Sequence, residues 1–164
     1  MAEEEKVTAE EEDTQKDKYL TFRLGEEIYG IDISVVIEII GIQPITSVPE
    51  VPEYVQGIIN LRGKIIPVVD MRLRFRRKFQ PYHDRTCVVV IEVGGLLIGL
   101  IVDGVSEVLG IPAAEVVPPP ELKAARNKYI RGIGKTGSTV TLLLDWDKLF
   151  SEEDEAAFED MTAD

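Results

Sequence analysis

The stretch YVQGIINLRGKIIPVVDMRLRF, residues 54–75, contains two apolar runs that meet at Asn60-Leu61-Arg62-Gly63. Both runs are short, rich in β-branched residues and bounded by turn residues, which is typical of buried strands. A tight turn between such strands needs polar residues and glycine, so Asn60 and Gly63 are expected there. No turn type requires an arginine, so Arg62 is either incidental surface charge or a residue that the protein presents.

The pattern around this turn occurs twice in the chain. YGIDISVVIEIIGI (29–42) aligns with IGLIVDGVSEVLGI (98–111) at an offset of 69, and YVQGI (54–58) aligns with YIRGI (129–133) at an offset of 75. Two constant offsets separated by one insertion of six residues indicate a duplication. Each copy has only about 60 residues, too few for a robust core of its own. We therefore expect the two units to pack together over a shared apolar surface. The second offset also pairs two further positions: Asp70 with Asp145, and Phe75 with Phe150.

The remaining segments indicate a mainly β chain. YLTFRL (19–24) predicts a strand that turns at Gly25 and returns as a second strand. The nearly continuous apolar runs on either side of Gly94-Gly95 predict a second hairpin, buried on both faces. Near residues 32–36 a single helical turn is expected to run into a strand ending at about residue 41, because so many β-branched residues disfavour a long helix.

A short helix is expected at the C-terminus, in the acidic segment 151–164. Ser151 and Asp154 have the spacing of a capping box, and Phe158 and Met161 contribute to a weak apolar stripe. Before the last strands, the prolines at 118–120 predict a rigid connector, and ELKAARN after them is expected to form one or two helical turns.

Charge is concentrated at the two ends of the chain. Residues 1–18 hold eight acidic residues against three lysines, residues 151–164 hold seven and no base, and the segment between is neutral. The net charge of −12 therefore describes solvated ends and says little about partners. Residues 1–17 lack apolar periodicity and are expected to be a disordered acidic tail, which is neither a secretory signal nor a transit peptide.

The sequence predicts no cofactor and no catalytic or metal site. It has no Gly-rich phosphate loop with its lysine, no Gly-x-Ser-x-Gly elbow and no metal-ligand spacing. No stretch has the roughly 18 uninterrupted apolar residues that a membrane span needs. The one cysteine, Cys87, excludes an internal disulfide framework, which suits a reducing cytoplasm, and is interpreted as a small buried hydrophobe. His83 is interpreted as an ordinary loop residue.

Four aspartates are candidates for acid–base chemistry. Asp70 and Asp145 both follow an apolar strand and precede a helical-looking segment, so each is expected to cap the next turn. Asp32 and Asp103 have no base or metal partner predicted near them. A small enzyme using Asp70 or Asp103 is the least favoured function.

The basic run RLRFRRK, residues 72–78, leaves three interpretations open. Solvated loop charge is favoured, an acidic protein surface comes second, and nucleic acid comes last because the core is neutral and both ends would repel phosphate.

The duplication also serves as an internal control on single residues. Features present in both copies are expected to serve the shared architecture, as Gly57 and Gly132 do, whereas features of one copy are candidates for function. At the turn the second copy reads Lys-Thr-Gly-Ser (135–138), so the fold makes this turn without Arg62. Arg62 is then either a freely varying exposed arginine or an interface anchor, a role in which arginine is enriched.

Three segments together resemble the CheW family of bacterial chemotaxis coupling proteins: YGIDISVVIEIIG, VQGIINLRGKIIPVVDMRLRF and GLIVDGVSEVL. The resemblance covers about residues 18–150, in the same order. It implies two five-stranded SH3-like β-barrels packed around a shared hydrophobic core, with short helical turns and a C-terminal helix. It also implies a non-enzymatic adaptor, cytoplasmic and monomeric alone, that couples the cytoplasmic tips of chemoreceptors to the regulatory domain of the histidine kinase CheA. Quasi-symmetric rings within receptor arrays follow from the same resemblance, with no membrane insertion and no nucleic acid.

The resemblance also assigns residues to two surfaces. Gly57 has a counterpart in the second copy, so we interpret it as primarily architectural and acting on the surface indirectly; Val36 and Glu38 also have counterparts. An alternative function is a coupling module that links a CheA-like kinase to another receptor-driven output. The long acidic N-terminal segment and the basic run depart from the family pattern and leave partner preference open. The kinase-facing residues implied are Val36, Glu38, Ile39, Gly57, Arg62 and Gly63, and the receptor-facing residues are Ile33, Cys87, Gly99 and Val105.

Overall fold

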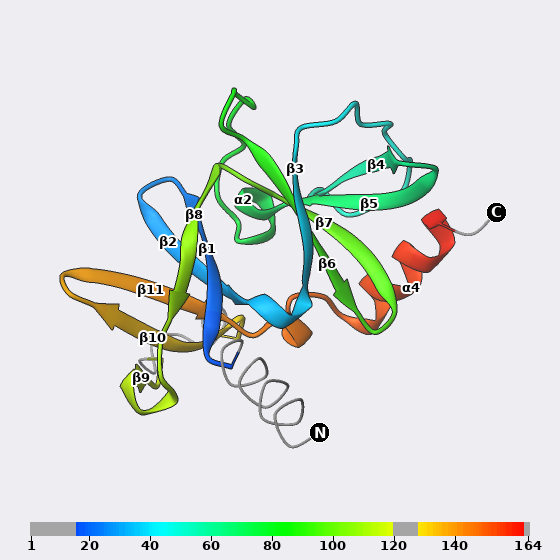
Figure 1. Ribbon diagram of the computed structural model, residues 1–164. Coiled ribbons are helices and arrows are strands. Elements are labelled where there is room, and N and C mark those ends of the chain that lie inside the picture. The colour runs from blue at the N-terminus through cyan, green and yellow to red at the C-terminus, as the bar shows by residue number, and fades with distance from the viewer. Residues whose placement is uncertain (1–15, 120–127, 163–164) are drawn as a thin grey trace, which may run out of the picture.

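The chain folds into two β-sheets with a helix at the C-terminal end (Figure 1). The computed structural model describes residues 16–119 and 128–162. Almost all of the predicted N-terminal tail and the predicted helical turns at 121–127 lie outside the described residues. The strands are β1 (Lys18–Leu24), β2 (Glu27–Asp32), β3 (Val36–Gly41), β4 (Val55–Leu61), β5 (Lys64–Asp70), β6 (Cys87–Val93), β7 (Leu96–Val102), β8 (Gly104–Gly110), β9 (Val116–Val117), β10 (Ile130–Thr136) and β11 (Thr139–Leu144).

The helical segments are short, apart from the last. The turn predicted before β3 is the 3-10 helix η1 (Ile33–Val35), which Asp32 caps by accepting a hydrogen bond from the amide of Ser34. The others are α2 (Met71–Arg74), η2 (Ala113–Glu115), η3 (Trp146–Lys148) and α4 (Glu152–Thr162).

The two sheets have matching strand orders. The first, sheet A, runs β8-β1-β2-β11-β10-β9, and the second, sheet B, runs β3-β6-β7-β5-β4. In each sheet two antiparallel hairpins are joined by one parallel pair, β2 with β11 in sheet A and β7 with β5 in sheet B. Strands at offsets of 69 and 75 therefore occupy equivalent places, which confirms the duplication. We call the barrel built on each sheet barrel A and barrel B.

The two copies do not each form their own barrel, however. Sheet A takes β1 and β2 from the first copy and its other four strands from the second. Sheet B takes β3, β4 and β5 from the first copy and β6 and β7 from the second. The copies thus exchange their first hairpins, and the shared apolar surface expected between them takes the form of two sheets that each contain strands of both copies. The exchange lets both hairpins bury two faces, which a unit of this size could not do alone.

The main hydrophobic core lies between the sheets. Phe22, Ile31, Val89, Ile91 and Leu100 belong to it, from strands of both copies. Val88 and Val90 point the other way, into a second cluster inside barrel B, because successive side chains of a strand alternate between its faces. A third cluster of Tyr19, Ile111 and Leu143 fills barrel A. The nearly continuous apolar run of β6 is explained by burial on both faces, as predicted.

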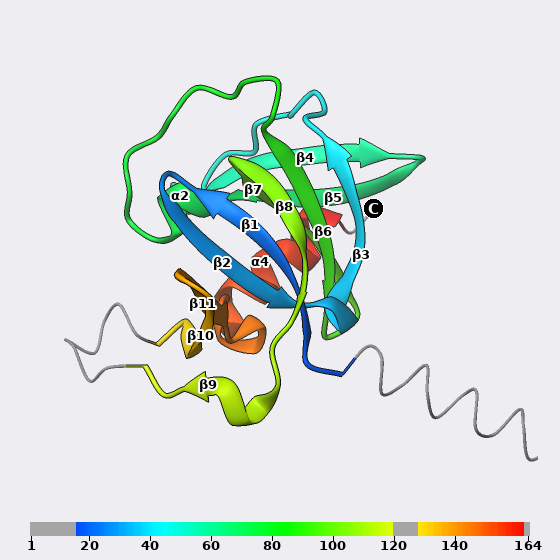
Figure 2. The same cartoon turned by 60° about the vertical axis from the view of Figure 1, so that its left-hand side comes forward.

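The C-terminal helix α4 packs against β5 and β7 (Figure 2). Its start is the predicted capping box: the Ser151 amide donates to Asp154 Oδ2 at 3.0 Å, and the Asp154 amide donates to Ser151 Oγ at 3.1 Å. Phe158 is fully buried with its ring against Phe150. Tyr54 donates its hydroxyl to Asp154, which fastens the helix start to the segment before β4.

Candidate protein-interaction surfaces

The β4–β5 turn has a backbone conformation that disfavours arginine. Arg62 and Gly63 are its two central residues and both have positive φ, 51° and 88°. That pattern belongs to the hairpin turns that prefer asparagine, aspartate and glycine. A left-handed conformation costs an ordinary residue about 1 kcal/mol or more relative to glycine. Asn60 stabilises the turn by accepting a hydrogen bond from the Gly63 amide at 2.8 Å. Arg62 therefore occupies this position against the local backbone preference.

The Arg62 side chain forms an ion pair with Glu38. Glu38 lies on β3, at the opposite edge of sheet B from β4, so the pair closes barrel B across its two edge strands. The Arg62 side chain is 71% exposed and that of Glu38 is 29% exposed. Exposed pairs contribute about 0–1 kcal/mol to stability, so this one orients the guanidinium more than it holds the fold.

Strand β3 presents apolar side chains beside this ion pair. Its residues alternate, with Val36 and Glu38 turned inward and Ile37 and Ile39 outward. Ile37 is 49% exposed and Ile39 is 44% exposed. Val36 packs against the main core, so of the predicted kinase-facing residues Ile39, Arg62 and Gly63 are the ones directly on the surface.

Gly57 is buried, and its lack of a side chain allows the backbone at Thr46 to approach closely. A Cβ at this position would lie 2.1 Å from the carbonyl oxygen of Thr46, and its φ is 146°. No side chain fits there without moving the segment that bridges to β4. This geometry supports the interpretation that Gly57 acts on the surface only indirectly.

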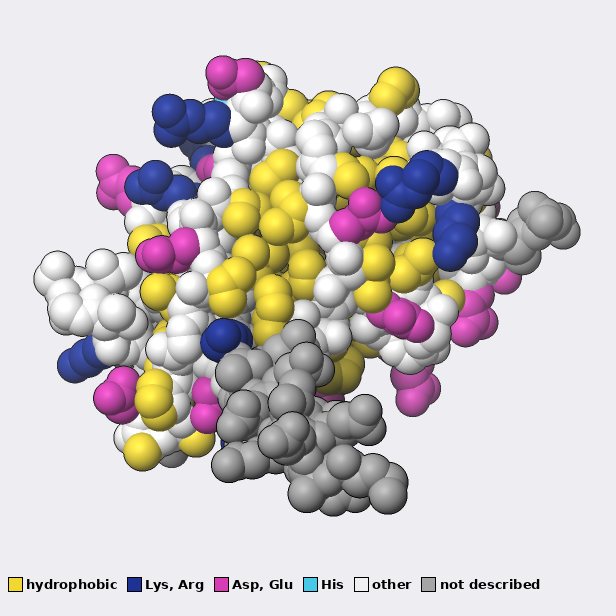
Figure 3. Space-filling view, in the orientation of Figure 1, with side chains coloured by type: hydrophobic (Ala, Val, Ile, Leu, Met, Phe, Trp, Pro, Cys, Tyr) yellow, Lys and Arg dark blue, Asp and Glu magenta, His cyan; other side chains and the backbone are white. Residues whose placement is uncertain are grey.

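Three of the four predicted receptor-facing residues lie on the apolar face between the two barrels, which we call the groove, and their assignment to a receptor stays a prediction. Ile33, Cys87 and Val105 are half-buried and pack against the main core from three different elements. Figure 3 shows hydrophobic side chains gathered in the centre of this face, between β8 and β3. Burial raises the pKa of the Cys87 thiol, so the thiol stays protonated and behaves as a small apolar group, as expected.

Gly99 is not part of that groove surface. A Cβ there would lie 2.7 Å from Val88 and 2.9 Å from Val68, both inside barrel B. Gly30, its counterpart in the other copy, is also confined, though less tightly, with Leu143 at 3.0 Å. Like Gly57, Gly99 allows strands to approach closely.

A cavity of about 770 Å³ adjoins the groove at its β8 end. Cys87 and Val105 belong to its lining, which joins it to the apolar groove. Four basic residues, Arg23, Arg72, His83 and Arg85, also line it.

The basic run 72–78 is mostly internal, so its interpretation as solvated loop charge is wrong for three of its four arginines. Arg74 lies between the rings of Tyr54 and Tyr129, at 4.7 and 4.5 Å, and donates to the Leu149 carbonyl. Arg77 pairs with Glu27 and donates to the Leu24 carbonyl. Arg72 pairs with Asp103. Only Arg76 and Lys78 are exposed basic residues of the run.

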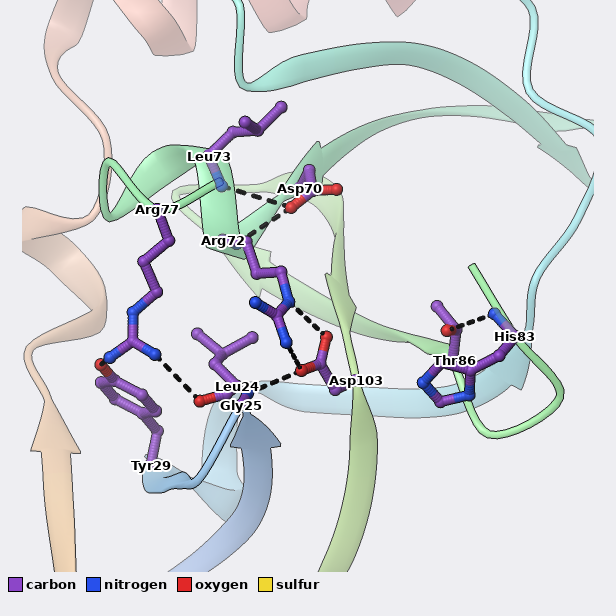
Figure 4. A network of polar contacts seen from close by, with 10 residues as sticks. All are labelled: Leu24, Gly25, Tyr29, Asp70, Arg72, Leu73, Arg77, His83, Thr86 and Asp103. Atoms are coloured by element: carbon purple, nitrogen blue, oxygen red, sulfur yellow. Dashed lines mark hydrogen bonds and ion pairs between the residues drawn. The ribbon is translucent and has the colours of Figure 1, made fainter. Parts of the chain in front are cut away.

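Asp103 joins the two barrels, although no partner was predicted for it. It lies between β7 and β8, accepts hydrogen bonds from the Arg72 guanidinium, one of them at 2.9 Å, and accepts another from the Gly25 amide at 2.6 Å (Figure 4). Burial alone would raise the pKa of Asp103, but the bonds from Arg72 and Gly25 outweigh it and lower the pKa. The sequence signal was weak because the two partners lie 31 positions apart on different elements.

The two repeated aspartates differ. Asp70 caps α2 as predicted, accepting from the amides of Arg72 and Leu73, and its other oxygen accepts from the Tyr82 hydroxyl. Asp145 makes no side-chain cap, so that prediction was wrong; its carboxylate faces Lys148 instead. Since the carboxylates of Asp70 and Asp103 are both engaged by donors, the structure offers no support for an acid–base pair. Among the described residues there is no cluster of His, Cys, Asp or Glu able to hold a metal.

None of the helices within residues 16–119 and 128–162 is long and apolar enough to cross a membrane.

Comparison with known proteins identifies relatives over almost the whole folded part. Residues 18–154 match the CheW-like domain family. The chain is 38% identical over 145 residues to the chemotaxis protein CheW of Klebsiella aerogenes, covering 88% of this chain and 87% of the relative. It is 34% identical over 140 residues to CheW of Treponema pallidum, covering 82% of each. The crystal structure of the scaffolding protein TtCheW from Thermoanaerobacter tengcongensis superposes with a TM-score of 0.77 at 38% identity, covering 82% of this chain and 92% of that one.

Proposed function

The chain belongs to the CheW family, and from that premise we propose that it is a non-enzymatic chemotaxis adaptor that couples chemoreceptors to the histidine kinase CheA. It does so by association alone: one surface meets the kinase, another meets the receptor tip, and the compact double barrel holds the two at a fixed separation. The protein works in the cytoplasm and is recruited to receptor arrays at the membrane.

The observation that carries this proposal is Arg62. Its backbone conformation disfavours it, its contribution to stability is small, and its guanidinium is exposed beside the outward isoleucines Ile37 and Ile39. Residues kept in strained backbone conformations cluster at functional positions. An exposed arginine next to apolar side chains on an edge strand is the composition of an interface centre. We assign this surface to the regulatory domain of the kinase.

The receptor surface is the groove that carries Ile33, Cys87 and Val105. It is apolar, lies between two rigid barrels and is open along one face, which suits the tip of a helical hairpin laid into it. Val36 borders the groove from β3, whose outward side chains belong to the kinase surface. The two surfaces therefore share one strand, and binding at one is expected to constrain the other.

Co-sedimentation with receptor-containing membranes and kinase tests the proposal. The protein is expected to sediment with receptors, to bring added kinase into the pellet, and to stimulate kinase autophosphorylation when all three are present. Failure of the folded protein to bind either partner would refute the adaptor function. Binding of kinase without binding of chemoreceptor tips would instead favour a coupling module for another receptor-driven output.

A further inference from the structure

The cavity of about 770 Å³ beside the groove holds basic side chains that the fold does not use. Arg23 and Arg85 are both exposed and line it. Within the described part of the chain, neither guanidinium has a carboxylate or hydrogen-bond partner, whereas the arginine deeper in the cavity, Arg72, is neutralised by Asp103. In a chain with 30 acidic residues against 18 basic ones, two unpaired arginines at one cavity are unexpected.

The positions of these arginines are set by rigid elements. Arg23 lies on β1 and pairs in register with Gly104 of β8. The carbonyl oxygen of Arg85 lies 3.8 Å from where a Cβ of Gly104 would be. Gly104 therefore lies between the backbones of Arg23 and Arg85, and because it has no side chain it leaves the cavity between them open. The backbone of Arg85 is fixed in turn, because its amide donates to His83 Nδ1 at 3.0 Å and the His83 amide donates to Thr86 Oγ1 at 2.9 Å (Figure 4).

The cavity is continuous with the apolar groove, since Cys87 and Val105 line both. A ligand that fits must therefore carry an apolar surface and a negative charge side by side. Residues 1–15 of the chain hold seven acidic residues against four small or scattered apolar ones, so they fit the cationic part better than the apolar groove. A polyanion such as nucleic acid fits the cavity but not the apolar groove, and the net charge of −12 would repel it.

We propose that Arg23 and Arg85 form a cationic subsite of the receptor groove that binds a carboxylate side chain carried by the helical hairpin of the receptor tip. This proposal rests on the proposed function and adds a polar anchor to an otherwise apolar contact. The carboxylate fixes the register of the hairpin along the groove, which apolar packing alone leaves free to slide. The attraction acts between partly exposed charges, so it weakens as salt rises.

The test is a charge reversal with a matched control. The double variant R23E/R85E is compared with K78E/K135E, which changes the net charge equally at exposed positions outside the cavity lining. Affinity is measured for a soluble receptor signalling fragment and, separately, for the kinase. R23E/R85E is expected to bind the receptor fragment more than tenfold more weakly at low salt, with the gap to wild type closing at high salt. Its kinase affinity, and both affinities of the control, are expected to stay within about twofold of wild type.

The possible outcomes distinguish failure of the subsite from failure of the adaptor function. Wild-type affinity of R23E/R85E for a receptor fragment that wild type does bind would overturn the subsite alone. A wild-type protein that binds no receptor fragment would overturn the adaptor function and the subsite with it. If deleting residues 1–15 raises receptor affinity and removes the difference between wild type and R23E/R85E, the acidic N-terminal segment is the occupant and the proposal is wrong.

Discussion

The β4–β5 turn and the β10–β11 turn occupy equivalent places in the two copies, and their first central residues differ in a way that bears on function. Both close a hairpin with two central residues, and Arg62 of the first corresponds to Gly137 of the second. The backbone at the two positions is nearly the same, with φ of 51° and 62°. Glycine satisfies that backbone without strain and arginine does not.

The partners of these turns differ too. Glu38 pairs with Arg62 in barrel B, whereas its counterpart Glu107 in barrel A is exposed and has no ion pair among the described residues. The glutamate is present in both copies but the pair in only one. The comparison teaches that barrel A shows what the fold requires, and barrel B shows what has been added to it.

The largest difference in stability is expected between alanine substitutions at two equivalent glycines, Gly57 and Gly132. In Gly57→Ala the new methyl group meets a backbone oxygen at 2.1 Å in a left-handed region, whereas in Gly132→Ala it meets a valine methyl group at 2.4 Å without that backbone strain. We expect Gly57→Ala to lower the free energy of unfolding by about 3 kcal/mol and Gly132→Ala by about 1 kcal/mol. Urea unfolding measures both.

Gly41→Ala is the control for these glycines, because no atom of the described residues lies within 4 Å of its Cβ position. Its free energy of unfolding should stay within about 0.5 kcal/mol of wild type. Equal losses for Gly57→Ala and Gly132→Ala would contradict the claim that the first copy is the more constrained here.

The next largest effect is expected from breaking the bridge that Asp103 makes to Arg72 and Gly25. This bridge is specific to the second copy, because the first copy has Ser34 at the equivalent position. Asp103→Asn weakens the bonds from Arg72 and Gly25 and is expected to cost about 2 kcal/mol at pH 7. The folded-state pKa of Asp103 is lowered, so its contribution is present above the unfolded value of about 3.9 and is lost as pH falls through the folded value.

Unfolding measured from pH 7 to pH 3 checks the Asp103 bridge. The stability gap between wild type and Asp103→Asn is expected to be constant above about pH 5 and to shrink below pH 4. Asp84→Asn, at a side chain that is 98% exposed, should leave stability unchanged. A gap as large at pH 3 as at pH 7 would show that the charge of Asp103 is not what holds the barrels together.

Replacing Arg62 by glycine gives the β4–β5 turn the residue that barrel A has at the equivalent position, Gly137. Arg62→Gly relieves the backbone strain and loses an exposed ion pair, so the free energy of unfolding should change by less than about 1 kcal/mol. Kinase affinity is expected to fall more than tenfold, about 1.4 kcal/mol, in titration calorimetry. Glycine is a cleaner replacement than alanine, because alanine would keep the strain.

The reverse exchange is the control for Arg62. Gly137→Arg in the Arg62→Gly background restores the charge of the protein but places it in the wrong barrel, so kinase affinity should not recover. Unchanged kinase affinity in folded Arg62→Gly would show that the strained arginine is not an interface anchor.

The smallest effect is expected from the glutamates. Glu38→Gln releases Arg62 from its ion pair and should weaken kinase binding only about two- to threefold, or about 0.5 kcal/mol, because the guanidinium remains present but is less oriented. Glu107→Gln in barrel A should have no measurable effect on kinase affinity. Equal effects of the two substitutions on kinase affinity would refute the claim that only the glutamate of barrel B orients an interface residue.

Much of the fold followed from local pattern. The two hairpins, the turn at η1, the capping box of α4 and the duplication all depend on residues close together in the sequence or on a fixed offset. The exchange of hairpins could not be predicted, because each hairpin has the same apolar pattern whichever copy it pairs with. Strand β2 pairs with β11 of the second copy, although β5, the equivalent strand of its own copy, has the same apolar pattern.

The candidate site was predicted unevenly. Arg62 was identifiable because one copy lacks it, but its pairing with Glu38 joins two strands 24 positions apart at opposite edges of a sheet. The basic run was misjudged because composition does not tell an arginine in water from one stacked between two tyrosines, as Arg74 is. The cavity of Arg23 and Arg85 had no sequence signal, since the two residues come from different copies.

The hairpin exchange also bears on how the polypeptide can be divided. The loop between α2 and β6, residues 75–86, extends as a wide arc at the boundary between the two copies (Figure 2). A cut there would leave each fragment with strands for both sheets but enough for neither. The fragments should stay unfolded apart and assemble when mixed, so a split reporter fused to them would read out assembly of both barrels at once.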